Sequence, residues 1–94
     1  MLWDEYLLVC LGEELSESAQ EVGKCLRFTC NDKHPSKPHT NLEGLSKEFS
    51  QVIAVLELLK EEGINVKIDE AEIQAKKKRL LEYAKYSRKL GALK

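Results

Sequence analysis

The sequence lacks the features that mark several specialised classes of protein. It contains two prolines, one methionine, one tryptophan and three cysteines in 94 residues, and aromatic residues make up 6%. No apolar run is longer than the five residues from Leu7 to Leu11, which is too short to span a membrane. No basic segment precedes an apolar one, so we expect no cleaved secretory signal. The odd number of cysteines favours free thiols and a cytoplasmic location.

Net charge is also nearly absent, because 15 Lys and Arg balance 16 Asp and Glu to a formal charge of −1. This balance excludes a generally basic nucleic-acid-binding protein, but it hides a segregation of charge. Residues 1–23 carry six acids and no base, whereas residues 76–94 carry eight bases and one acid. The length predicts one small domain over residues 1–94, and its marginal core favours oligomerisation.

Three segments are predicted to form α-helices, and the first two have a clear apolar periodicity. The first helix is predicted from about Leu2 to Arg27, with its apolar face formed by Leu8, Leu11, Leu15, Val22 and Leu26. The second has its apolar face at Leu42, Leu45, Phe49, Val52, Ile53, Leu56 and Leu59. No single helix can bury such a stripe alone. We therefore predict an all-α fold, a helical bundle completed by a second chain.

The segments that flank these helices carry typical boundary residues. Thr40 and Glu43 have the spacing of a capping box at the start of the second helix, although Asn41 could be the N-cap instead. Gly63 fits the end of that helix, and Asp69 fits the start of a third one. Residues 28–40 hold both prolines and are predicted to form a loop, and residues 64–68 a short extended connector.

The first predicted helix carries glutamates that share one side. Glu13, Glu14 and Glu17 lie three or four residues apart, within an arc of roughly 100° beside the apolar face. The second helix offers Glu48, with Gln51 one turn further on. Oxygen ligands from two facing helices suit Mg²⁺, which would relieve the repulsion among these acids. A solvated acidic helix face is the alternative explanation.

The motifs EELSESAQEVGKCLRF, DKHPSKPHTN, LSKEFSQVIAVLELL and YAKYSRKLG together cover nearly the whole chain. With them the sequence resembles the MazG-like nucleoside triphosphate pyrophosphohydrolases, of the all-α NTP pyrophosphatase superfamily. The family pattern is EExxE on one helix and ExxD on a later one. Here Glu13 to Glu17 match the first half and Glu48 begins the second, but Gln51 stands where the family has aspartate.

The resemblance implies a hydrolase that cleaves between the α- and β-phosphates of a nucleoside triphosphate, giving a monophosphate and pyrophosphate. Glu14, Glu17 and Glu48 would bind Mg²⁺, with Mn²⁺ as an alternative, and Gln51 would be a neutral ligand. Glu13 would bind a further metal ion or activate the attacking water. The family forms dimers or dimers of dimers. The neutral Gln51 leaves open a full enzyme, a slow one and an inactive nucleotide-binding module.

A triphosphate in an acidic pocket also needs basic groups to hold its remaining charge. Lys24 and Arg27, on the same predicted helix as the acids, are the best candidates, and Lys33 on the loop is a further one. Ordinary surface charge is the alternative for this pair, since Lys24 could simply pair with Glu21 one turn earlier.

Other patterns favour simpler explanations. The spacing of Cys25, Cys30, His34 and His39 does not match a standard zinc motif, which favours a buried thiol and a polar loop. The basic run 76–79 lies in a predicted helix, where its charges spread around the axis, so we do not expect nucleic-acid binding. The C-terminal motif contains Tyr83, Tyr86 and Arg88. These residues could pack in a dimer interface or help to close a nucleotide pocket.

Overall fold

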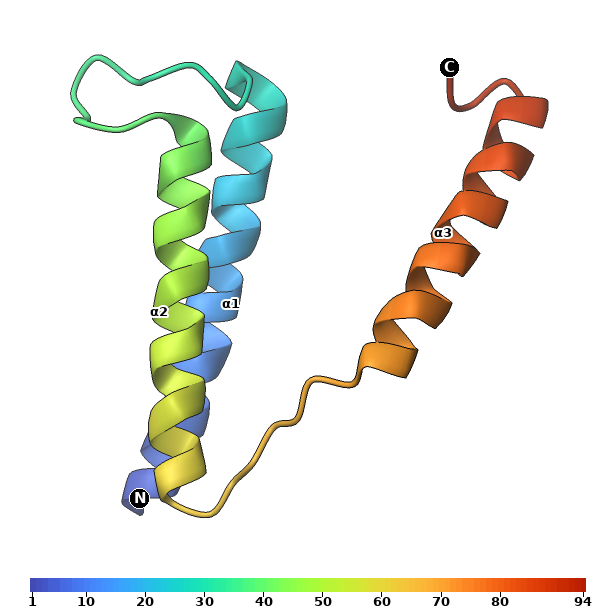
Figure 1. Ribbon diagram of the computed structural model, residues 1–94. Helices are drawn as coiled ribbons and strands as arrows, with labels where there is room; N and C mark the ends of the chain where they lie inside the picture. The colour runs from blue at the N-terminus through green and yellow to red at the C-terminus, as the bar shows by residue number, and fades with distance from the viewer.

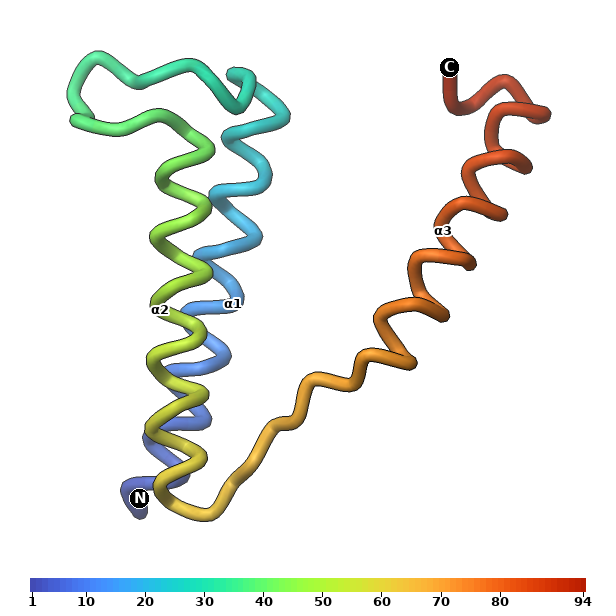
Figure 2. Tube along the Cα trace, viewed as in Figure 1, coloured from blue at the N-terminus to red at the C-terminus, as the bar shows by residue number.

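A computed structural model describes all of residues 1–94 and contains three α-helices and no strand (Figure 1). The helices are α1 (Trp3–Phe28), α2 (Asn41–Glu61) and α3 (Glu70–Lys89). α1 and α2 lie side by side and run in opposite directions, and an extended connector leads from α2 to α3 (Figure 2). The predicted all-α class is confirmed. None of the three helices combines the length and the apolar character that a membrane span requires.

The start of α2 forms the capping box that the sequence predicts, with Thr40 as its N-cap. The Thr40 hydroxyl accepts a hydrogen bond from the Glu43 N–H at 3.1 Å, and the Glu43 carboxylate accepts one from the Thr40 N–H at 3.0 Å. The bond from the Thr40 backbone lowers the pKa of Glu43 because it stabilises the ionised carboxylate. Asn41 is the first helical residue instead, and its side chain donates to the Thr29 carbonyl at 2.8 Å.

The connector between α2 and α3 also follows its local sequence. Gly63 has φ of +86°, and its N–H and that of Ile64 donate to carbonyls of the last turn of α2, at 3.0 and 2.9 Å. This is the pattern of a Schellman motif. Residues 64–68 form the predicted connector without a strand. The Asp69 carboxylate then accepts from the Ala71 N–H at 2.9 Å and caps α3.

The face of α1 that packs against α2 is not the one that the periodicity indicated. Leu7 is buried with Val52 and Leu59, and the other two buried residues are the small Ser18 and Gly44. Small residues at a helix interface let the two helix backbones approach closely, so α1 and α2 pack together through these buried residues. Of the two predicted apolar faces, Val52 and Leu59 are buried within one chain, whereas most of the other members are exposed. The exposed members are Leu8, Leu15, Val22, Leu26, Leu42, Phe49 and Ile53.

α3 lies apart from the other two helices and makes no contact with either (Figure 1). None of its residues is buried, and Leu80 and Leu81 are exposed. The radius of gyration is 17.1 Å, whereas a compact chain of this length would have about 12 Å. The three helices therefore do not close into a bundle within one chain, and much apolar surface has no partner there.

Candidate metal site and the adjoining pocket

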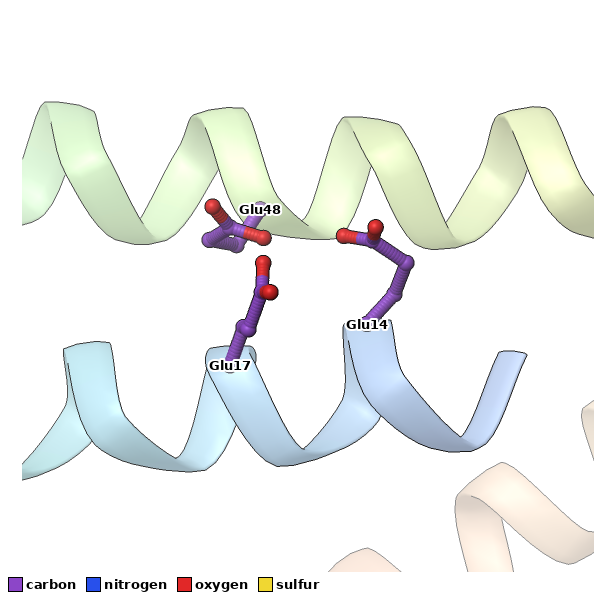
Figure 3. A group of neighbouring side chains, drawn as sticks. All are labelled: Glu14, Glu17 and Glu48. Atoms are coloured by element: carbon purple, nitrogen blue, oxygen red, sulfur yellow. The ribbon is translucent and has the colours of Figure 1, made fainter. Parts of the chain in front are cut away.

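Three glutamates from two helices converge between α1 and α2, and we call them the carboxylate cluster. Glu14 and Glu17 come from α1 and Glu48 comes from α2, with ligand oxygens that all lie within 4.8 Å of one another. Figure 3 shows the three side chains pointing into the space between the helices, with Glu17 and Glu48 facing each other. Glu14 and Glu48 are half-buried and Glu17 is exposed, so the cluster is open on one side.

Gln51 lies within hydrogen-bond reach of the carboxylate cluster. With its amide nitrogen turned inward, it donates to Glu48 Oε2 and to Glu14 Oε2 at 3.0 Å each. In the opposite orientation its amide oxygen would face the same carboxylates, which is repulsive unless a cation lies among them. Gln51 is thus part of this arrangement, and rotation of one amide group lets it serve either the apo cluster or a metal-bound one.

No cationic side chain offsets the negative charge of the carboxylate cluster. The charge of Glu48 raises the pKa of Glu17 above its ordinary value, and a hydrogen bond between the two side chains adds to this effect. No lysine or arginine forms an ion pair with any member, because the one ion pair of the structure joins Lys24 and Glu21. Carboxylate oxygens at this spacing, with an amide oxygen beside them, form a donor set that fits a hard cation such as Mg²⁺.

The other predicted site residues lie around the carboxylate cluster at different places. Glu13 is exposed on α1, close enough for its charge to act on Glu17. Lys24 and Arg27 lie further along α1 and line a pocket at the loop end of the helix pair, where a hydrogen bond to Glu21 raises the pKa of Lys24. Lys33 does not line this pocket.

Sequence reasoning missed several residues of this pocket, which we call the basic pocket. The loop contributes Lys37, His34 and His39, and α2 contributes its first residue, Asn41. Which loop residues meet the end of α1 depends on the path of the loop, and helical periodicity does not describe that path. The two prolines and two histidines of the loop were the available indication of a constrained, polar segment.

The remaining candidates do not join the carboxylate cluster. The cysteines and histidines named above form no three-residue ligand group, and burial raises the pKa of the Cys25 thiol. Tyr83 and Tyr86 are exposed on α3, and Arg88 donates to the Lys94 carbonyl at 3.2 Å. Because α3 contacts neither α1 nor α2, these residues do not reach the cluster within one chain.

Comparison of the chain with protein-family models, with curated proteins and with solved structures gives no match. The family resemblance therefore rests on the motifs in the sequence.

Proposed function

We propose that this protein is a metal-dependent nucleoside triphosphate pyrophosphohydrolase that converts a (d)NTP into a (d)NMP and pyrophosphate. The observation that carries the proposal is the convergence of Glu14, Glu17 and Glu48 from two helices, with their oxygens within 4.8 Å of one another. Gln51 beside them and the cations of the basic pocket further along α1 are consistent with a site for a metal-bound polyphosphate. A role in housecleaning of the nucleotide pool follows from the resemblance.

The proposed roles follow from the chemistry of each side chain. Glu14, Glu17 and Glu48 would hold Mg²⁺ or Mn²⁺, which would polarise phosphoryl oxygens and offset their charge when bound. Glu13 would accept a proton from the attacking water, since it is exposed and lies at the rim of the carboxylate cluster. Lys24 would hold phosphate charge outside the cluster.

The test is release of pyrophosphate from a panel of (d)NTPs in the presence of Mg²⁺ or Mn²⁺. We expect turnover of at least one nucleotide, and a loss of about 100-fold or more in Glu14→Gln and Glu48→Gln. Glu57→Gln is the matched control, because Glu57 is an exposed residue of α2 outside the cluster. Absence of turnover on every nucleotide would overturn the proposal, as would full activity in both cluster variants.

A catalytically weak or inactive nucleotide- and metal-binding module is the second candidate, and Gln51 favours it. Its amide contributes no charge and satisfies two carboxylates by hydrogen bonds, so it competes with a metal ion for them. This candidate predicts that nucleotide with Mg²⁺ raises the melting temperature without turnover. Gln51→Asp should then raise Mg²⁺ affinity, and an unchanged affinity would show that residue 51 is not a ligand.

We also propose a homodimer or a dimer of dimers, in the cytoplasm, without nucleic acid or membrane as partner. The apolar side chains left exposed on all three helices support the assembly, because a second copy would bury them. The opposite charges of the two ends of the chain also support association of chains. Residues 1–23 carry six acids and no base, and residues 76–94 carry eight bases and one acid.

A further inference from the structure

The basic pocket combines several cations with one acid. Lys24, Arg27 and Lys37 line it together with two histidines, and Glu21 is its one carboxylate. Glu21 is already paired with Lys24, at 2.8 Å between Oε1 and Nζ. Neither Arg27 nor Lys37 forms an ion pair. Lys37 also lies close to Lys24, which is a second cation. The pocket therefore has an excess of positive charge that attracts an anion.

The loop that supplies Lys37 is held in place by the start of α2. The N–H groups of Asn41 and Leu42 donate to the carbonyls of Asp32 and Cys30, each at 2.9 Å. The Lys37 N–H closes a turn on the His34 carbonyl at 2.9 Å. These bonds also occupy the first N–H groups of α2, so any ligand here is held by side chains and not by the helix N-terminus. A fixed loop presents its cations with little entropic cost of ordering.

The basic pocket and the carboxylate cluster follow one another along a single face of α1. Glu14, Glu17, Glu21 and Lys24 repeat at spacings of three and four residues, so they share this face. Lys24 is about 10 Å beyond Glu17 along the helix axis, from seven residues at 1.5 Å each. Side chains of a helix lean toward its N-terminus, which tilts Lys24 toward the cluster. One extended ligand can therefore reach both places.

We propose that the basic pocket binds the terminal phosphates of a polyphosphate ligand, with Lys37 and Lys24 as its main contacts. This inference rests on the proposed function and deepens it, because it assigns the direction of the substrate. The pyrophosphate that leaves would lie toward the loop, and the nucleoside would lie on the other side of the cluster. Seven of the eight residues that line the pocket are polar or charged, and three of them are lysine or arginine, which favours a phosphate group there.

The experiment measures binding of inorganic tripolyphosphate by calorimetry without any divalent metal, at about 0.15 M salt to screen weak surface attraction. We expect Lys37→Ala to weaken binding about tenfold, as for loss of one charged contact. Lys47→Ala is the matched control, since Lys47 is exposed on α2 and outside the basic pocket. Equal affinity in Lys37→Ala and the parent would overturn the inference. So would an equal loss in both lysine variants, which would show nonspecific attraction.

A second arm separates this inference from the proposed function. Glu14→Gln should bind metal-free tripolyphosphate at least as tightly as the parent, because Glu14 lies outside the basic pocket and its substitution removes a negative charge, while it loses pyrophosphate release from (d)NTPs. If no nucleotide is turned over but Lys37→Ala still weakens tripolyphosphate binding, the enzyme proposal fails and the phosphate pocket stands. If turnover occurs and Lys37→Ala leaves both binding and KM unchanged, the pocket assignment is overturned alone.

Discussion

At the residue scale, the feature that governs the site is that its acids are placed at a cost to the fold. Glu17 is exposed to solvent on one side, yet Glu48 faces it across the helix pair and raises its pKa. Like charges held together oppose folding unless a cation or a proton relieves them. Gln51 eases this repulsion by donating to two of the carboxylates. A cation bound among these carboxylates would relieve the same repulsion.

Removing the charge of Glu17 should stabilise the metal-free protein at neutral pH. The folded state holds the Glu17 proton more tightly than the unfolded state, because its pKa is raised above 4.5. The ionised form therefore lowers stability at pH 7, and this cost disappears as the pH falls below 4.5. We expect Glu17→Gln to melt at a higher temperature than the parent at pH 7 with a chelator present, and the difference to vanish near pH 4.

The same variant should lose stabilisation by Mg²⁺. The difference between the melting temperatures of Glu17→Gln and the parent should therefore shrink or change sign as the metal is added. Glu57→Gln, on the exposed side of α2, should change neither the pH dependence nor the response to Mg²⁺. A Glu17→Gln protein that is less stable than the parent in the chelator at pH 7 would contradict the charge argument.

Thr29 is the one non-glycine residue of the chain whose φ is positive. It follows the last residue of α1 with φ of +69° and ψ of +154°, a conformation that is nearly confined to glycine. Its carbonyl accepts the Asn41 side chain at 2.8 Å, which helps to hold it there. We expect Thr29→Gly to raise the free energy of unfolding by about 1 kcal/mol, from a strain of about 1–3 kcal/mol less the entropy of glycine in the unfolded chain.

Thr29→Ala is the control for this prediction, because alanine keeps the strained Cβ and loses only the rest of the side chain. It should be no more stable than the parent in urea unfolding. Equal stabilisation by glycine and alanine would show that the Thr29 side chain, and not its backbone conformation, is unfavourable.

At the scale of the elements, the sequence predicted what depends on neighbouring residues. The ends of α2 and the start of α3 lie where Thr40, Gly63 and Asp69 placed them, because caps act within a few residues of the chain. The face of α1 that packs against α2, with Leu7 and Ser18, was missed. The apolar residues of α1 also extend over a second face, which is exposed within one chain. Periodicity reports that a helix is amphipathic but does not tell which neighbour covers each face.

In the candidate site as well, the residues on the helices could be predicted from the sequence and those on the loop could not. Glu14, Glu17 and Glu48 could be brought together in advance, because facing turns of two paired helices put them at one level. Gln51 followed from its spacing to Glu48. Lys37 could not be found, since its approach to Lys24 depends on a loop that is fixed by hydrogen bonds between residues about ten positions apart.

Two glycines of the helix pair should respond differently to the same substitution. A Cβ on Gly23 meets nothing within 4 Å, so Gly23→Ala should raise the free energy of unfolding by about 0.5–1 kcal/mol through helix propensity. A Cβ on Gly44 would lie 2.8 Å from the Glu21 carboxylate and 3.2 Å from the His39 ring, so these side chains must move. We expect Gly44→Ala to gain clearly less than Gly23→Ala, and equal gains in urea unfolding would contradict close packing at Gly44.

At the scale of the whole molecule, the charge that nearly cancels in the sum is separated in space. The acids of residues 1–23 lie on α1, and the bases of residues 76–94 lie mainly on α3, which does not touch α1 in the same chain. Both helices also leave apolar side chains in solvent. A single chain of this kind buries three apolar residues almost completely, which is little for 94 residues. The missing burial and the missing charge partner are both supplied if chains associate.

Association of chains should therefore be required for stability, and one apolar residue on the uncovered face of α1 should report it. In size-exclusion chromatography with light scattering, we expect the parent to have at least twice the monomer mass. Its melting temperature should rise with protein concentration. Val22→Glu puts a charge into the uncovered apolar face, where Val22 is 51% exposed within one chain. It should lower the mass or the melting temperature, because a charge without a partner would be buried in the interface. Gln20→Glu introduces the same charge at an exposed polar residue of α1 and should change neither. A monomeric parent with a concentration-independent melting temperature would refute the assembly, because the exposed apolar face of α1 would then face only solvent.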